Sequence, residues 1–195
     1  MKILIIALVT GVVILAALAG NIMSNVEQAD YKLVRSKENI EIRDYSPMIL
    51  AEVEVSAERK QAIKQGFRIL ADYIFGNNTS NKKIDMTAPV IQEQYTGGWK
   101  IGFVMPKKYT LETLPKPNSK DVVLLSLSTR RFVTIRFSGL ADDENIKQHI
   151  ENLEAYILVE KLKPIGGIVL AFYNPPWTLP FLRHNEVMIE IGVEQ

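Results

Sequence analysis

The sequence predicts a single α+β domain in which a twisted antiparallel sheet or open barrel carries two helices. The chain has 195 residues, a length that suits one domain. Short strand-like runs alternate with two amphipathic helices, and this order of elements occurs twice along the chain. No linker long enough to separate two independent domains interrupts the pattern.

An N-terminal hydrophobic segment precedes the domain, because residues 3–20 contain no charge. Two interpretations stay open: an uncleaved membrane anchor, or a signal peptide cleaved after Ala17-Leu18-Ala19. Lys2 precedes the segment and Glu27 is the first charge after it, which favours a cytoplasmic N-terminus. We therefore expect residues 1–29 to form an anchor or signal with a short polar linker, and residues 30–195 to lie outside the cytoplasmic membrane, on the periplasmic side.

The first repeat begins with two strands. Apolar and polar residues alternate over residues 40–43 and 49–55, as in strands with one buried face. Ser56 is the expected N-cap of a helix that ends near Gly76. Its apolar stripe consists of Ile63, Phe67, Leu70 and Ile74. Two further strands are expected over residues 84–94 and 99–105, joined by a hairpin at Gly97-Gly98.

The second repeat follows the same order. A strand over residues 133–137 ends at Gly139, and a second helix carries apolar residues 83 positions after those of the first: Ile146, Ile150, Leu153 and Ile157. Strands over residues 169–173 and 186–191 flank a Pro-rich turn. Neither repeat alone supplies enough core to fold, so we expect both to share one sheet, with a ligand-sized groove between strands and helix.

Composition and motifs argue against several classes of function. The formal net charge is only +1, which argues against a generic nucleic-acid binder. The absence of cysteine excludes disulfides, thiolate metal sites and covalent haem attachment, and two histidines leave little room for a multi-histidine metal site. None of the common hydrolase, metalloprotease or nucleotide-binding motifs occurs. We therefore expect a binding protein with no catalytic residues, not an enzyme.

Several short strings, taken in order, carry a family resemblance. They are IRDY at 42–45, GFR at 66–68, YIFGNN at 73–78, MTAPV at 86–90, FVMP at 103–106, LETLP at 111–115, IRFSG at 135–139, YNPPW at 173–177 and LRHNEV at 182–187. With them the chain resembles the SOUL haem-binding family over nearly all of residues 31–193. The resemblance implies two βαββ repeats in a distorted barrel with two flanking helices, akin to effector-binding domains of bacterial regulators, and non-covalent binding of haem or another tetrapyrrole.

A tetrapyrrole needs an apolar slot and cations near its propionates. Lys60, Lys64 and Arg68 recur every four residues and form one basic row on the first helix. The apolar candidates for the slot are Phe67, Met86, Phe103 and Tyr173. The resemblance implies that haem lies at the first helix and that Lys64 matches a basic position there, whereas Asp72 departs from the family pattern and would repel a propionate.

Alternatives stay open at each step. The basic row is also explained by a solvated helix face on which Arg68 pairs with Asp72. His149, His184, Met86 and Tyr95 are the candidate iron ligands, and none is singled out. The function is thus a haem carrier, buffer or sensor, or else a binding module for another amphipathic small molecule, or a ligand-free interaction protein at the membrane.

Overall fold

A computed structural model describes residues 26–192. The expected anchor or signal peptide lies outside the described residues. Within residues 26–192, no helix has both the length and the apolar character needed to cross a membrane.

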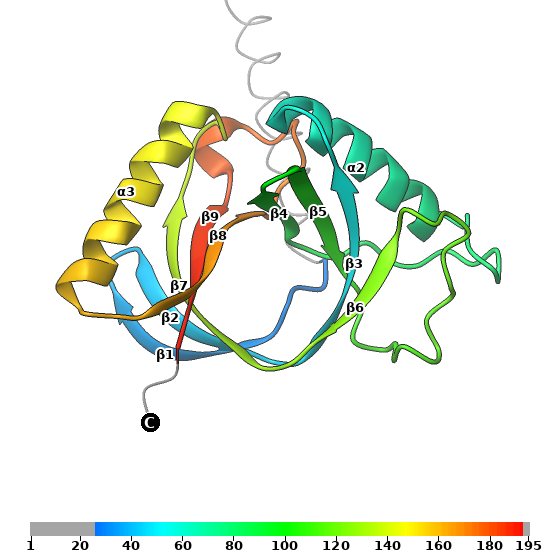
Figure 1. Ribbon diagram of the computed structural model, residues 1–195, viewed down its shortest axis with the longest axis horizontal. Coiled ribbons are helices and arrows are strands. Elements are labelled where there is room, and N and C mark those ends of the chain that lie inside the picture. Colours follow the sequence, from blue (N-terminus) through cyan, green and yellow to red (C-terminus); the bar gives the residue numbers. More distant parts are fainter. Residues whose placement is uncertain (1–25, 193–195) are drawn as a thin grey trace, which may run out of the picture.

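Nine strands and two α-helices make up the described chain (Figure 1). The strands are β1 (Tyr31–Lys37), β2 (Ile40–Tyr45), β3 (Met48–Val55), β4 (Val90–Tyr95), β5 (Gly98–Val104), β6 (Val123–Leu127), β7 (Arg130–Phe137), β8 (Pro164–Phe172) and β9 (Asn185–Ile191). The helices are α2 (Arg59–Ile74) and α3 (Asp143–Val159), with a 3-10 turn, η1 (Pro180–Leu182), before β9. The predicted α+β class is confirmed.

All strands join one antiparallel sheet in the order β1-β2-β7-β9-β8-β4-β5-β3-β6. The sheet curls, and its edge strands β1 and β6 do not pair with each other. The barrel of the prediction is therefore an open half-barrel.

The sheet order confirms the predicted repeat. The order from β2 to β6 is symmetric about its centre, between β8 and β4. Each strand of the first repeat has its counterpart at the mirrored position: β2 and β6, β7 and β3, β9 and β5, β8 and β4. Each repeat also gives one strand to the other, since β2 pairs with β7 and β6 pairs with β3. The two repeats interlock, so neither completes its sheet alone.

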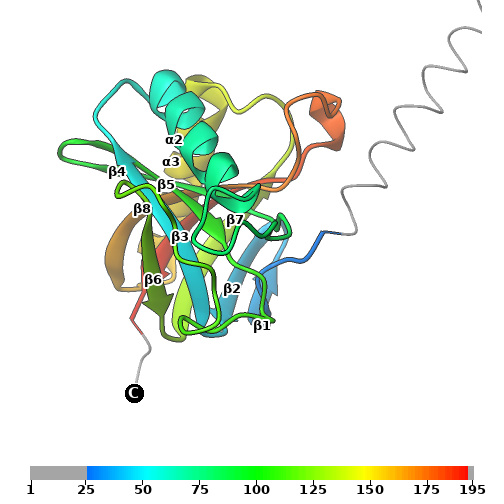
Figure 2. The same cartoon turned by 90° about the vertical axis from the view of Figure 1, so that its right-hand side faces the viewer.

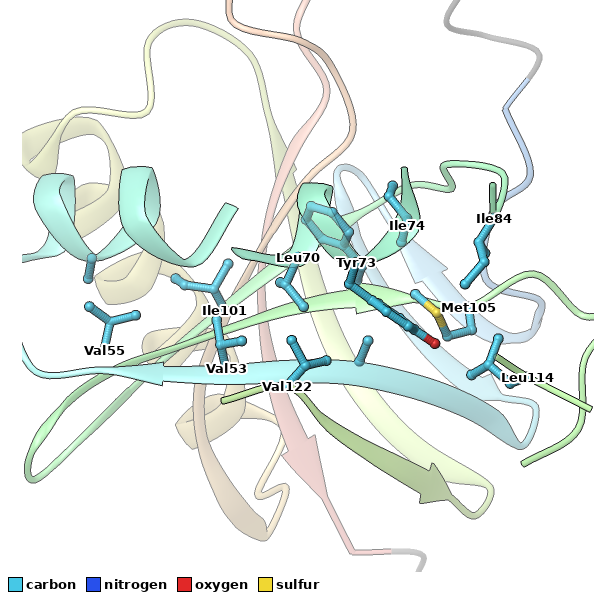
Figure 3. Close-up of a cluster of buried hydrophobic side chains, with 13 residues drawn as sticks. Val53, Val55, Leu70, Tyr73, Ile74, Ile84, Ile101, Met105, Leu114 and Val122 are labelled. Carbon is cyan, nitrogen blue, oxygen red and sulfur yellow. The ribbon is translucent and has the colours of Figure 1, made fainter. Parts of the chain in front are cut away.

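Helix α2 covers β3 and β5 (Figures 1 and 3). Leu70, Tyr73 and Ile74 on its inner face are buried against Val53 and Ile101 of these strands. The helix approaches the sheet closely at Gly66, where an added Cβ would lie 2.6 Å from Ile101 Cγ1. Burial of this apolar face, rather than intrinsic helix propensity, holds α2 in place.

Helix α3 covers β7 and β9 in the same way. Ile146, Leu153 and Ile157 pack there against Val133 and Val187. The Asp142 side chain caps the helix by accepting a hydrogen bond from the backbone N–H of Asn145 (2.9 Å). A third buried cluster occupies the other face of the sheet and contains Tyr45, Ala88, Phe132, Val169, Ala171, Tyr173 and Met188.

Several expected boundaries differ from the structure. The N-cap of α2 is Glu58, not Ser56, and it makes no side-chain capping bond. Strand β4 begins only at Val90, because Pro89 has no N–H to offer the ladder. Strands β1 and β6 were not predicted: β1 is exposed along its whole length and β6 is a short edge strand, so neither shows a clear buried face. The hairpin turn at residues 96–97 is confirmed by the pairing of Tyr95 with Gly98.

Candidate ligand-binding site

The basic row predicted on the first helix lies on the outer face of α2. Lys60, Lys64 and Arg68 are exposed, and none of them forms an ion pair with another residue in the described part of the chain. Helical spacing places Phe67 about one turn after Lys64 and about 20° around the helix from Lys60, on the same side of α2. The row therefore presents three uncommitted cations beside an aromatic ring.

Phe67 joins this stripe to the core. The side chain is 39% exposed, which is unusual for a phenylalanine on an otherwise well-packed helix. Its ring lies 5.2 Å from that of Phe103 in an edge-on contact at 69°. Phe103 is buried on β5, and Met86 packs half-buried against the same cluster. The structure thus joins Phe67 to Phe103 and places Met86 against the same core cluster.

Asp72 does not neutralise the row. Its carboxylate accepts a hydrogen bond from Asn77 Nδ2 and forms no ion pair with Arg68 within residues 26–192. At 100° per residue Asp72 lies about 80° around the helix from Lys64. The Arg68–Asp72 ion pair of the alternative interpretation does not form, and Asp72 lies about 140° around the helix from Phe67.

Tyr173 lies elsewhere, in a polar network on the other face of the sheet. Its hydroxyl donates to Glu186 Oε2 (2.8 Å). Arg43 Nη1 donates to the same oxygen (3.0 Å), and Arg43 Nη2 forms an ion pair with Glu186 Oε1 (3.0 Å). Arg43 also donates to Glu41 (2.6 Å) and to the Tyr45 hydroxyl (3.1 Å). Glu186 is fully buried, so these partners are what permit its charge.

Burial and charge set the ionisation of this network. Burial acts to raise the pKa of Glu186, but the His184 hydrogen bond and the Arg43 charge outweigh it and leave that pKa below its usual value. Burial, with the nearby Glu186 charge, raises the pKa of Tyr45 to about 12 and also raises the pKa of Tyr173. The buried part of the network therefore holds the charged Glu186 carboxylate and Arg43 guanidinium beside two neutral phenols.

The two histidines have structural partners. His184 stacks on Tyr173 with ring centroids 4.0 Å apart and places Nε2 2.7 Å from Glu186 Oε1. His149 stacks on Phe137 (4.3 Å), with Nδ1 2.7 Å from the backbone oxygen of Asn145. Within residues 26–192, no three His, Cys, Asp or Glu side chains gather in an arrangement able to hold a metal.

Arg183 fixes the turn before β9 to the preceding connection. Arg183 donates to the backbone oxygens of Thr178 and Pro176 and fixes the connection that projects from the body after β8 (Figure 2). Glu186 bonds side chains: His184 two residues before it, Tyr173 in the same connection, and Arg43 on β2. The sequence offered little signal for the Arg43 contact, because that residue lies 143 positions away.

Comparisons with known proteins place these features in a family. The family model described as SOUL heme-binding protein matches residues 26–190. Heme-binding protein 1 of Xenopus laevis is 24% identical over 179 residues, covering 86% of this chain and 93% of that protein. Heme-binding protein 2 of Homo sapiens is 31% identical over 159 residues, covering 76% of each chain.

Solved structures with low identity share the fold. The EcmrR C-terminal domain superposes with a TM-score of 0.62 at 10% identity, covering 83% of this chain and 98% of that domain. A hydrolase from Listeria innocua gives a TM-score of 0.54 at 13% identity, covering 82% and 94% of the two chains. At such identities the likeness describes the arrangement of strands and helices alone.

Proposed function

The chain belongs to the SOUL heme-binding protein family, and on this basis we propose that it binds haem or a related tetrapyrrole non-covalently on the outer face of α2. The observation that carries the proposal is Phe67, an exposed aromatic ring set among the uncommitted cations Lys60, Lys64 and Arg68. A haem is a flat apolar macrocycle with two carboxylates, so it needs this combination of surfaces.

Each side chain has a distinct role in the proposed site. Phe67 contacts the macrocycle, and Phe103 and Met86 support that contact from the core. Lys60, Lys64 and Arg68 pair with the propionates. Tyr173 has no role in the proposal, because its hydroxyl is committed to Glu186 on the other face of the sheet.

Binding without turnover is the proposed activity. The family is one of binding proteins, and the stripe holds cations and an aromatic ring but no acid–base pair. An exposed site exchanges its ligand with solvent or a partner readily, which suits a carrier or buffer. A position outside the cytoplasmic membrane is part of the proposal, supported by the uncharged run of residues 3–20 and the charges around it.

Haemin titration of charge variants tests the site. Lys64→Glu should weaken haemin affinity at least about tenfold, followed at the Soret band, because it turns a propionate partner into a repelling carboxylate. Phe67→Ala should weaken it as well, through loss of apolar contact. Lys120→Glu, at an exposed position outside α2, makes the same change in net charge and should leave the affinity unaltered. Equal affinities for Lys64→Glu and Lys120→Glu would refute the proposed site.

The proposed location is tested on the membrane fraction. A protein that retains Met1 and is cut by added protease only outside the cytoplasmic membrane is the result expected for an anchor. A mature N-terminus near Gly20 would show that the segment is a cleaved signal peptide and not an anchor. If protease cuts the domain only when it is added on the cytoplasmic side, the proposed location is wrong.

A further inference from the structure

The face of the sheet opposite the helices encloses a cavity of its own. The cavity has a volume of 210 Å³ and is lined by residues from strands β2 to β9. Several of these strands are not neighbours in the sheet, so the curl of the sheet must bring them face to face. Its apolar lining includes Met48, Leu50, Ile91, Phe132, Val169 and Met188. These residues come from both repeats, so the cavity lies where the two repeats meet.

The cavity has room for one aromatic ring with a substituent. Protein cavities of about 150 Å³ with apolar walls bind benzene. A tetrapyrrole has four such rings in one plane and does not fit in 210 Å³. This cavity is therefore not a second haem site, and its occupant has to be smaller.

Two carboxylates, Glu52 and Glu93, and two cations, Lys100 and Arg130, line the cavity. Two further carboxylates outside the lining, Glu54 and Glu190, pair with these cations. Lys100 pairs with Glu52 (3.4 Å) and with Glu54 (3.5 Å). Arg130 pairs with Glu190, with its Nε 2.8 Å from Oε1. Both cations are thus already matched by carboxylates.

Glu93 is the remaining charge on the cavity wall. It lines the cavity from β4, opposite Lys100 in the ladder with β5, and its charge also acts on Arg130. Within residues 26–192 it forms no ion pair, because both cations pair with other carboxylates. Gly167 on β8 lies beside the Glu93 carboxylate and has no side chain. A methyl group added at Gly167 would lie 3.7 Å from Glu93 Oε1, an ordinary van der Waals distance, so there is free space beside the carboxylate. Burial raises the pKa of Glu52, and the Glu93 charge adds to this rise, as expected where carboxylates outnumber cations.

We propose that this cavity, lined by Glu93 and by apolar residues of both repeats, binds a small aralkyl monocation, with the ring among Phe132 and Met188 and the ammonium group at Glu93. An apolar body fits the lining, and a positive head supplies the counter-charge that Glu93 lacks. The ligand class is opposite in charge to haem, so this site is separate from the proposed site on α2.

Calorimetric titration of the full chain with benzyltrimethylammonium tests the proposal. Neopentylbenzene has the same shape without the charge, and phenylacetate carries the opposite charge. We expect one binding site for the cation, at least about fivefold weaker binding of the neutral probe, and no binding of the anion. Absence of cation binding at millimolar concentration, or equal binding of cation and neutral probe, would overturn the proposal.

Variants locate the bound cation. Glu93→Gln should weaken cation binding about fivefold, whereas Glu144→Gln removes an exposed carboxylate of α3 and should have no effect. Leu125→Trp fills the cavity from β6 and should abolish binding. Ser128→Trp places a large side chain at the exposed edge of the cavity. It should also weaken cation binding, and it replaces Leu125→Trp if that variant does not fold. Haemin affinity should stay unchanged in all of these, and unchanged cation affinity in Glu93→Gln and both Trp variants would overturn the site.

Discussion

At the scale of single residues, the most constrained group in the molecule is the Glu186 carboxylate. It is fully buried and accepts hydrogen bonds from Arg43 and Tyr173, with His184 Nε2 at 2.7 Å. A buried charge is tolerated only when its partners replace the lost water. The network therefore stabilises the fold only as a complete set, and removing one member leaves the others buried and unpaired.

Replacing Glu186 by Gln should destabilise the protein by about 3 kcal/mol, because the buried Arg43 loses its principal counter-charge. The free energy of unfolding is measured by urea denaturation. Glu151→Gln, which removes an exposed carboxylate paired with Lys147 on α3, is the matched control and should change stability little. A Glu186→Gln variant as stable as the control would show that the network does not contribute.

The same carboxylate predicts an acid dependence of stability. Its pKa in the folded protein lies below the ordinary glutamate value of 4.5, so the unfolded chain binds a proton more readily than the folded one. Its contribution is fully present above pH 4.5 and is lost as the pH falls below 4.5 through the folded-state pKa. Urea denaturation at pH 3 to 6 should show this loss in the wild type and a smaller loss in Glu186→Gln. Equal slopes in the two proteins would contradict the assignment.

At the scale of elements, the contact between α2 and β5 depends on Gly66. An added methyl group there would lie 2.6 Å from Ile101 Cγ1 and 2.8 Å from Ile101 Cβ. These atoms belong to a fully buried side chain in the middle of the sheet, so they have no free space to move into. The position of α2, and with it that of Lys64 and Phe67, follows from this close approach.

Gly66→Ala should therefore destabilise the protein by about 1–2 kcal/mol, even though alanine favours a helix over glycine. Thermal and urea denaturation measure the change. Gln61→Ala, at an exposed position of the same helix, should be neutral or slightly stabilising. A stabilised Gly66→Ala variant would show that α2 can move away from the sheet at low cost.

The elements were predictable from sequence to the extent that one face of each is buried. The stripe Ile63, Leu70 and Ile74 and the alternation in residues 49–55 identified α2 and β3, since helix and sheet burial produce those periods. The polar residues of the alternating strands, such as Arg43 and Glu52, were assigned to solvent. That assignment was wrong, because the curl of the sheet encloses its second face, and curl depends on pairings between distant strands.

At the scale of the whole molecule, the duplicated half-barrel presents two unlike surfaces. Its outer face carries α2 with exposed cations and Phe67, whereas its concave face carries the buried network and an apolar cavity whose charged lining includes Glu93. The site candidates on α2 were predictable, because they lie within one helix and spacing alone aligns them. The concave features were not, because the cavity combines residues from β2 to β9 and the network pairs β2 with residues near the end of the chain.

The central claim is that a tetrapyrrole binds the outer face of α2. The most direct test is NMR of the isotope-labelled full chain with paramagnetic haemin, using zinc protoporphyrin as the diamagnetic reference. We predict that the amide signals of Lys64, Phe67 and Ala71 broaden most, at one equivalent of haemin. Broadening centred on concave-face residues such as Ile91 and Gly102, or spread evenly over the surface, would contradict the claim.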